Sequence, residues 1–510
     1  MGILRRALPV WLLLTANVSA NEKWERFYES EVKREWENAV EAAERVLIVR
    51  SFKDLDMPEA AQWLLERPVL GEHSAHVVRE AILVLQTYKR PETIQAMVAT
   101  YDKRFKKDWW RRAIALQAFA KNRTETARGP IHRGLQDKKP GVVVSACRAA
   151  GVQKDTDLRN KVKAALKHKS WHVRAAALRS IHEMNFHSDL PVVFPLFCAD
   201  KSARVRYEAW RTIQKLSLEK FGCDPAEWKA WYEERIQSVP EGLKNPWGRA
   251  IPKVKGPVPQ PGWFFQVPVL GDRVVFCIDS SGDMDNTWRI DVESERQKSP
   301  PERTPDFFSV KTKWQLVRAN LKRCLNALPP TTEVGFVFFS NKLQVRPEER
   351  TRFSKNNAKQ RDTILAQMKE GIHVQGSTDM AAALGAAWGF FKSGDPDTNF
   401  TKGCDTIVFV TDGLPTAGAM TNKSEEIRDL AWQVGLPRSL KIHTIGLHNH
   451  AFRLMRWLAE DSAALYQHAQ QHGDTAEPQD LDFWPEKKRK FKLAQLKAMR
   501  DKKRRKKPGN

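Results

Sequence analysis

Apolar and polar positions follow the period of a helix in the first half of the chain. Between residues 75 and 216 apolar side chains recur with i, i+4 spacing, and one pattern returns at intervals of 31 to 33 residues. Its copies begin at Val78, Arg111, Val142, Val173 and Val205. Repeats of this length stack because one helix pair cannot cover its own apolar face. The pattern therefore predicts a helical solenoid over residues 21–237.

The second half changes to short β-branched and aromatic runs that alternate with helical stretches. The expected strands are 273–278, 333–339, 343–346, 405–411, 440–445 and 464–466, and the expected helices are 312–328, 357–369, 380–391, 424–433 and 452–460. This alternation predicts a doubly wound, mainly parallel, Rossmann-like α/β sheet within residues 271–470. In such a sheet, ligands bind beyond the carboxyl ends of the strands, where the strand order reverses.

Proline separates the two halves. Residues 238–270 contain seven prolines, which exclude regular helix and favour extended chain, so we expect a linker there. The whole chain has 510 residues, of which 41% are apolar, and this composition excludes a wholly disordered protein. No run of eighteen apolar residues occurs, so we expect no membrane span.

The first twenty residues have the three parts of a secretory signal peptide. Arg5 and Arg6 precede an apolar stretch at 7–14, and the small residues Val18 and Ala20 stand at the −3 and −1 positions before a charged segment. An ordinary amphipathic first helix is the alternative. We expect cleavage after residue 20 and a mature protein that is secreted, periplasmic or on the cell surface.

Positive charge is concentrated at the other end. The formal net charge is +24, and residues 486–510 carry thirteen Lys and Arg against two acids. The candidate binding residues are Lys502, Lys503, Arg504, Arg505, Lys506 and Lys507. A basic tail over 471–510 would bind acidic polysaccharide or an anionic membrane surface; in an exported protein we do not expect nucleic acid. A solvated, disordered tail is the alternative.

Oxygen-bearing side chains follow the carboxyl ends of two expected strands. Asp279, Ser281 and Asp283 come after the first strand, Asp412 comes after the fourth, and Thr378 precedes a helix between them. Ligands that are all oxygen, without His or Cys, suit a hard cation such as Mg²⁺ or Ca²⁺. We therefore expect a divalent-cation site at the crevice where these loops meet.

These motifs give the second half a resemblance to a known family. It resembles a von Willebrand factor A domain with a metal-ion-dependent adhesion site, whose pattern Asp-x-Ser-x-Ser, Thr and Thr-Asp-Gly is matched by Asp279, Ser281, Thr378 and Asp412. The first half resembles HEAT-type repeats, and exported bacterial proteins join the two. Asp283 departs from the pattern, which has Ser there. A third carboxylate would hold the ion more strongly but leave it less attraction for an anionic ligand.

The resemblance implies an exported, non-enzymatic binding protein in which a divalent cation bridges to an acidic group of a protein partner. The solenoid would be a second binding surface or a spacer. Two alternatives remain: a structural scaffold whose metal site is disabled by Asp283, and a metal-assisted hydrolase. The sequence contains neither a Gly-rich phosphate loop nor a Gly-x-Ser-x-Gly elbow.

Cysteine usage adds one open question. The six cysteines have no metal-type spacing, and Cys147 and Cys277 fit buried apolar positions. A disulfide among Cys223, Cys324 and Cys404 is left open by the sequence.

Overall fold

The computed structural model describes most of the two halves of the chain. The described residues are 24, 32–237, 261–288, 310–348, 353–370, 372, 374–389, 400, 402–448 and 450–469. The expected signal peptide, the basic tail with its candidate binding residues Lys502 to Lys507, and most of the expected linker lie outside them. None of the helices in these ranges combines the length and the apolar character that a membrane crossing needs.

The first half is helical, as the apolar period predicts. Its elements are α4 (Lys33–Asn38), α5 (Ala42–Ser51), α6 (Pro58–Leu64), η2 (Leu65–Gly71), α7 (Ala75–Leu85), α8 (Pro91–Arg104), α9 (Trp109–Ala115), η3 (Leu116–Phe119), α10 (Glu125–Gly134), α11 (Pro140–Gln153), α12 (Thr156–Ala165), α13 (Trp171–Met184), η4 (His187–Asp189), α14 (Leu190–Ala199), α15 (Ala203–Ser217) and α16 (Pro225–Gln237).

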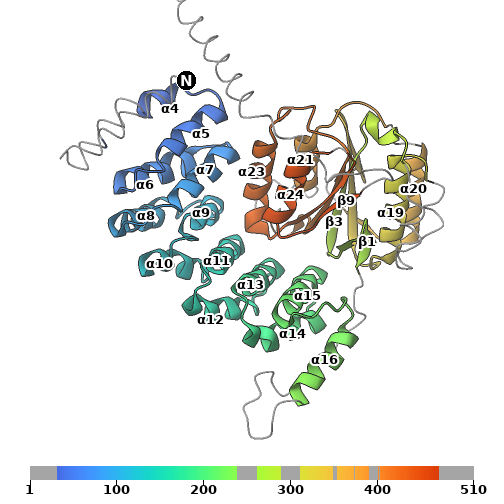
Figure 1. Cartoon of the computed structure of the whole chain (residues 1–510), viewed down its shortest axis with the longest axis horizontal. Coiled ribbons are helices and arrows are strands. Elements are labelled where there is room, and N and C mark those ends of the chain that lie inside the picture. Colours follow the sequence, from blue (N-terminus) through green and yellow to red (C-terminus); the bar gives the residue numbers. More distant parts are fainter. Residues whose placement is uncertain are drawn as a thin grey trace, which may run out of the picture.

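These helices form two curved rows. The row α5, α7, α9, α11, α13 and α15 lies on the side of the second half of the chain, and α6, α8, α10, α12 and α14 form the row outside it (Figure 1). Neighbouring helices of a row pack on one another, for example α11 on α13 and α13 on α15. The rows therefore share one continuous apolar core, as stacking of incomplete units requires.

The valines that begin copies of the sequence pattern are core positions. Val142, Val173 and Val205 are completely buried. Arg112 and Arg174 make matching contacts in different copies of the pattern: each uses Nε and Nη2 on both oxygens of one aspartate and Nη1 on two backbone carbonyls of the preceding turn. These arginines therefore join successive turns within the helical region.

The second half is a mixed sheet with helices on both faces, as expected. The strand order is β5-β4-β3-β7-β8-β9, with β6 paired to β4. The pairs β3–β4, β3–β7, β7–β8 and β8–β9 are parallel, while β5 and β6 run antiparallel to β4. Since β4 and β7 lie on opposite sides of β3, the chain order reverses at β3, and a crevice is expected beside its carboxyl end.

The elements of this half are β1 (Gly262–Phe264), β2 (Val267–Val269), β3 (Arg273–Asp279), η5 (Gly282–Asp285), α19 (Lys313–Ala327), β4 (Glu333–Phe339), β5 (Leu343–Arg346), β6 (Ser354–Lys355), α20 (Ala358–Glu370), α21 (Met380–Trp388), β7 (Thr406–Thr411), α23 (Ser424–Gly435), η7 (Leu436–Arg438), β8 (Lys441–Leu447), α24 (Phe452–Asp461) and β9 (Tyr466–Ala469).

Successive residues of the central strand face two different cores. Phe276 and Ile278 of β3 pack with α19 and α20, whereas Val275 and Cys277 pack with α21, α23 and α24. Both faces of β3 are thus buried, which explains why its sequence is continuously apolar instead of alternating. This rigid strand places Asp279, its last residue, at the carboxyl edge of the sheet.

The end of the expected linker is folded. The short strands β1 and β2 pair antiparallel and pack against α19, with Phe264 buried. Pro268 lies within β2, where a residue without an N–H is tolerated at an edge. The prolines predict a linker, but Phe264 and Phe265 at its end are buried in the apolar core of the α/β half. The open question of a disulfide is also answered, since Cys324 and Cys404 are both buried free thiols.

The helical region contacts the α/β half beside the amino ends of its strands. Asp272, which precedes β3, accepts hydrogen bonds from Ser202 Oγ at 2.5 Å and from Ala203 N at 3.1 Å, and so caps α15. Phe400, which precedes β7, is buried against the rings of Trp109 and His172. These contacts lie at the edge of the sheet opposite Asp279.

A buried ion cluster joins the two halves near the start of β8. Lys441 Nζ lies 3.1 Å from Glu208 Oε1, and Arg204 Nη1 lies 2.8 Å from the same oxygen. The three side chains are at most 7% exposed. Burial alone would raise the pKa of Glu208, but the charges of Lys441 and Arg204 outweigh it and lower the pKa to about 2. Glu208 is therefore charged and pairs with Arg204 of its own helix and with Lys441 of the α/β half, where burial lowers the pKa of Lys441 to about 7 and the charge of Glu208 opposes that shift.

A second ionic contact lies between α7 and the helices α23 and α24. Arg79 Nη1 lies 2.8 Å from Asp461 Oδ2 and 3.0 Å from Asp429 Oδ1. His76 Nδ1 lies 2.6 Å from Asp429 Oδ2.

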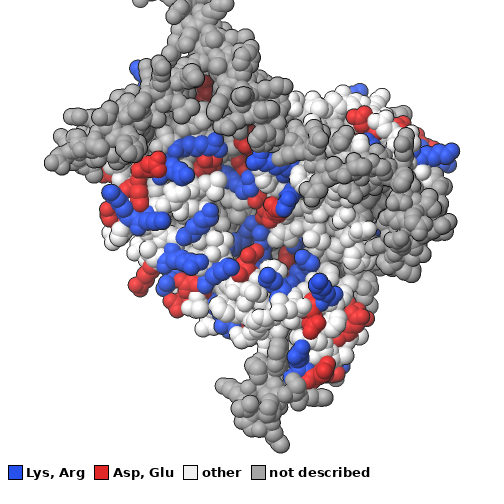
Figure 2. Space-filling view, in the orientation of Figure 1, with Lys and Arg blue, Asp and Glu red and all other residues white. Residues whose placement is uncertain are grey.

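Other charges on the helical region are spread over its surface. Figure 2 shows Lys, Arg, Asp and Glu interspersed on the face in view, without a large area of one sign.

Candidate ion site

Three loops meet beside the carboxyl ends of β3 and β7. Gly282 N donates to Gly376 O at 3.0 Å, which joins the loop after β3 to the loop before α21. Thr416 N donates to Thr378 O at 3.0 Å, which joins the loop before α21 to the loop after β7. Gly376 is required at its turn because its φ is +85° and a Cβ there would collide with Asn341. The backbone therefore brings the expected site residues together.

Asp279 is completely buried and held by two hydrogen bonds. Its Oδ1 accepts from Ser281 N at 2.8 Å, and its Oδ2 accepts from Thr411 Oγ1 at 2.6 Å. Burial and the charge of Asp412 nevertheless raise its pKa to about 7. These bonds do not compensate the buried negative charge, so the site favours a cation.

Asp412 has one oxygen engaged and one that is open. Lys313 Nζ donates to its Oδ2 at 2.7 Å, whereas Oδ1 is buried and has no hydrogen-bond partner among the described residues. Burial raises the pKa of Asp412, although the charge of Lys313 opposes the shift. An unpartnered carboxylate oxygen in a buried position needs a ligand, and a metal ion is one that would satisfy it.

The two expected hydroxyl ligands are also buried at the meeting point. Ser281 and Thr378 are each 4% exposed. Gly413 leaves room for Thr378, since a Cβ at this position would lie 3.1 Å from Thr378 Oγ1. The loop after β7 can therefore approach the Thr378 hydroxyl closely.

Asp283 is placed differently from the other expected ligands. It lies on η5, its side chain is exposed, and its Oδ1 accepts from Asn286 Nδ2 at 3.2 Å. In the described part of the chain, no three His, Cys, Asp or Glu side chains come together as a metal-binding group. A cation at this position would thus be held by Asp279, Asp412 and the hydroxyls, and Asp283 would act on it through its charge.

The donor set fits a hard divalent cation. It consists of two buried carboxylates, one of which has an unpartnered oxygen, and two buried hydroxyls, with no nitrogen or sulfur ligand. Two residues have roles here that the sequence pattern does not predict. Thr411, part of the Thr-Asp-Gly run, donates to Asp279 instead of serving as an expected ligand, and Lys313, which follows the helix N-cap Thr312, lies outside the pattern.

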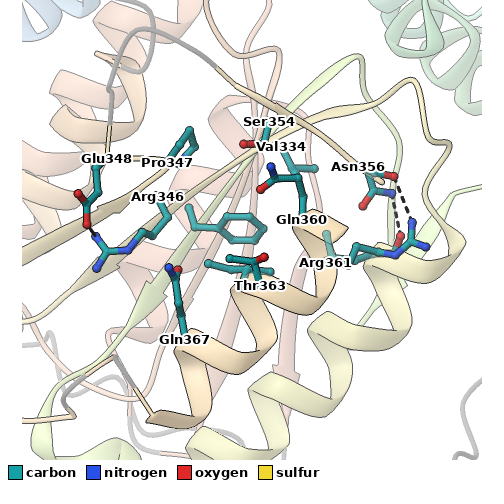
Figure 3. Close-up of a pocket in the computed structure, with 13 residues that line it drawn as sticks. Val334, Arg346, Pro347, Glu348, Ser354, Asn356, Gln360, Arg361, Thr363 and Gln367 are labelled. Carbon is teal, nitrogen blue, oxygen red and sulfur yellow. Dashed lines mark hydrogen bonds and ion pairs between the residues drawn. The ribbon is translucent and has the colours of Figure 1, made fainter. Parts of the chain in front are cut away.

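A separate cavity lies elsewhere in the α/β half. Its volume is about 240 Å³, and β4, β5 and α20 line it; Figure 3 shows Arg346, Gln360 and Gln367 around it. Because Val334 in its wall is near the amino end of β4, the cavity is not continuous with the loops at the carboxyl ends. None of the expected ion-site residues lines it.

The fold and the site can now be compared with known proteins. Residues 274–414 match the von Willebrand factor type A domain family. The match extends from β3 to the loop after β7, and so includes the meeting point of the three loops. The resemblance to this family expected from the sequence is confirmed for these residues, and we call the α/β half the type A domain.

Solved structures show distant likenesses. The chain is 14% identical to the "von Willebrand factor type A from Catenulispora acidiphila" over 40% of each chain, with a TM-score of 0.29. It is 14% identical to the "PilB minor pilin from Streptococcus sanguinis" over 46% of this chain and 62% of that one, with a TM-score of 0.28. It thus covers less than two thirds of either structure. No curated protein in the comparison matches the chain.

Proposed function

We propose that this protein is an exported, non-enzymatic binding protein whose type A domain uses a divalent cation, Mg²⁺ or Ca²⁺, to bind an acidic group of a protein partner. One observation carries the proposal: three loops that are hydrogen-bonded to one another carry two buried carboxylates and two buried hydroxyls, and one oxygen of Asp412 has no partner among the described residues. Type A domains are commonly interaction modules, and this supports binding over catalysis.

Each residue of the site has a separate task. Asp279 and Asp412 supply the negative charge that attracts a cation, and Ser281 and Thr378 supply neutral oxygen ligands. When bound, the ion offers a positive charge to which a carboxylate can be coordinated, which gives the contact a strict geometry. Asp283 is expected from the sequence as a ligand. We propose that it changes the affinity of the site for the cation through its charge.

We propose that the helical region serves mainly as a holder and spacer. Its inner row is in contact with the type A domain at Asp272, Phe400 and Lys441, beside the amino ends of strands, and α7 also contacts α23 and α24. The ion site lies at the carboxyl ends of β3 and β7, and none of the contacts described above involves Asp279, Ser281, Thr378 or Asp412. A partner would then bind at the carboxyl edge of the type A domain.

We further propose that the outer parts of the chain direct the protein to its place of action. Residues 1–20 would export it, and the basic tail at 471–510 would bind acidic polysaccharide or an anionic membrane surface. This arrangement would place the ion site outside the cytoplasm, where Ca²⁺ and Mg²⁺ are both present.

The proposal can be tested by selecting peptides from a random displayed library on the immobilised full-length protein in Mn²⁺, Mg²⁺ or Ca²⁺, with elution by EDTA. We expect enrichment of peptides that contain Asp or Glu. Thr378→Val removes one hydroxyl and keeps the backbone contacts of the loop. This variant should retain at most about one tenth as many such peptides as the unmodified protein.

Thr363→Val is the matched control, because Thr363 is exposed on α20 and its hydroxyl bonds only to a carbonyl of its own helix. This variant should behave as the unmodified protein. Selection of peptides without an acidic residue, or equal retention by Thr378→Val, would contradict the proposed binding mode.

A structural framework with a silent ion site is the second candidate function. The observation that favours it is the Lys313–Asp412 ion pair, which already places one positive charge at the site. A framework would yield no EDTA-eluted peptides in the same selection.

A further inference from the structure

A lysine ammonium lies among the acidic groups of the ion site. Lys313 Nζ is 2.7 Å from Asp412 Oδ2, and the two side chains are 7% and 0% exposed. A buried ion pair of this kind is costly to form unless its charges are compensated locally. Here the ammonium of Lys313 compensates buried negative charge, because Asp279 ends the strand beside the one that Asp412 follows.

The backbone attaches Lys313 to the loop that carries Asp283. Lys313 N donates to Asn286 O at 3.2 Å, and Asn286 Nδ2 donates to Asp283 Oδ1 at 3.2 Å. Trp288 N also donates to Lys311 O at 2.8 Å. Asn286 therefore contacts both residues, and the start of α19 is held against the loop after β3.

The two residues bring opposite charges to the same part of the site. Lys313 places its ammonium in direct contact with Asp412, and Asp283 places a carboxylate on the loop that Asn286 joins to Lys313. Asp279, Asp283 and Asp412 together carry three negative charges, one more than a divalent cation neutralises. With Lys313 included, the charges of the ion-loaded site sum to zero.

We propose that Lys313 is a built-in counter-cation that offsets Asp283 at the ion site. The inference rests on the proposed function, since it assigns a role toward the bound ion. Lys313 lowers the affinity of the site for divalent cations, and it keeps the ion-loaded site able to attract a carboxylate despite the additional acid at position 283.

Calorimetric titration of the full-length protein with Mn²⁺ tests this assignment. Lys313→Met should raise the Mn²⁺ affinity by about tenfold or more, because it removes a charged group in direct contact with Asp412. Asp283→Ser should lower the affinity by a smaller factor, because the Asp283 side chain is exposed and screened by solvent. The double variant should fall between the two single variants.

Two further variants separate charge from structure. Lys313→Gln retains a hydrogen-bond donor for Asp412 Oδ2 and lacks the charge, so it should also bind Mn²⁺ more tightly than the unmodified protein. Lys311→Met removes an exposed lysine two residues away and should leave the affinity unchanged. Circular dichroism in the absence of metal establishes that each variant is folded.

The outcomes distinguish this inference from the proposed function. If the unmodified protein binds Mn²⁺ and both Lys313 variants bind it equally or more weakly, the counter-cation role is overturned and the ion site stands. If neither the unmodified protein nor any variant binds Mn²⁺, both are overturned. Binding by the Lys313 variants alone would support the counter-cation role and make the unmodified site one that Lys313 has silenced.

Discussion

Replacing Glu208 by glutamine is expected to lower the free energy of unfolding by about 3–5 kcal/mol, because it leaves two buried cations without their counter-charge. Arg204 and Lys441 both lie against Glu208 Oε1, and neither side chain is more than 2% exposed. Since Lys441 belongs to the type A domain and Glu208 to the helical region, the loss also weakens the contact between the two halves. Chemical denaturation monitored by tryptophan fluorescence measures the change.

The control for Glu208→Gln is Glu460→Gln. Glu460 pairs with Arg456 on the exposed surface of α24, so its loss should cost about 0.5 kcal/mol or less. Equal effects of the two substitutions would contradict the role given to the buried cluster.

The carboxylate of Glu208 should also make the free energy of unfolding depend on pH in the acidic range. The pKa of Glu208 is depressed in the folded protein from its ordinary value of 4.5 to about 2, so its charge stabilises the fold fully above the ordinary value. That contribution is lost as the pH falls from about 4.5 toward 2. The loss of stability over this range should be smaller in Glu208→Gln.

Replacing Asp279 by asparagine should have opposite effects on stability without and with a divalent cation. Without the ion, the amide retains the hydrogen bond from Ser281 N and removes a buried charge beside Asp412, so we expect the free energy of unfolding to rise by about 1–2 kcal/mol. At an ion concentration a hundred times its dissociation constant, the unmodified protein should gain about 2.7 kcal/mol, and Asp279→Asn should gain nothing.

Denaturation in Mg²⁺, in Ca²⁺ and in EDTA measures both effects. Asp362→Asn, which changes an exposed aspartate on α20, is the matched control and should keep the full gain from the ion. A variant Asp279→Asn that is stabilised by the ion as much as the unmodified protein would contradict the assignment of Asp279 to the ion site.

The architecture could be predicted from the sequence because its signals are local. The buried strands read as continuous apolar runs, and the expected strands 333–339 and 343–346 coincide with β4 and β5. The candidate position of the ion site rests on the same information, since Asp279 ends β3 and Asp412 follows β7, the neighbouring parallel strand. The order of the strands within the sheet is the part of this prediction that the local signals do not contain.

The parts that the sequence did not reveal depend on contacts between distant segments. Lys313 is separated from Asp412 by 99 positions, and an N-terminal helix lysine is most often solvated. Glu208 and Lys441 are even farther apart, and each resembles an ordinary surface charge in its own helix or strand. The prolines of residues 238–270 predict extended chain without helix, and they do not indicate that β1 and β2 pair as a hairpin against α19.

The central claim is that Asp279, Ser281, Thr378 and Asp412 enclose a divalent cation, and anomalous diffraction from crystals grown with Mn²⁺ tests it most directly. The account predicts a strong anomalous peak bounded by Ser281, Thr378 and Asp412, which is absent from crystals of Asp279→Asn grown in the same way. Well-ordered loops that enclose water alone in the Mn²⁺ crystals would contradict it.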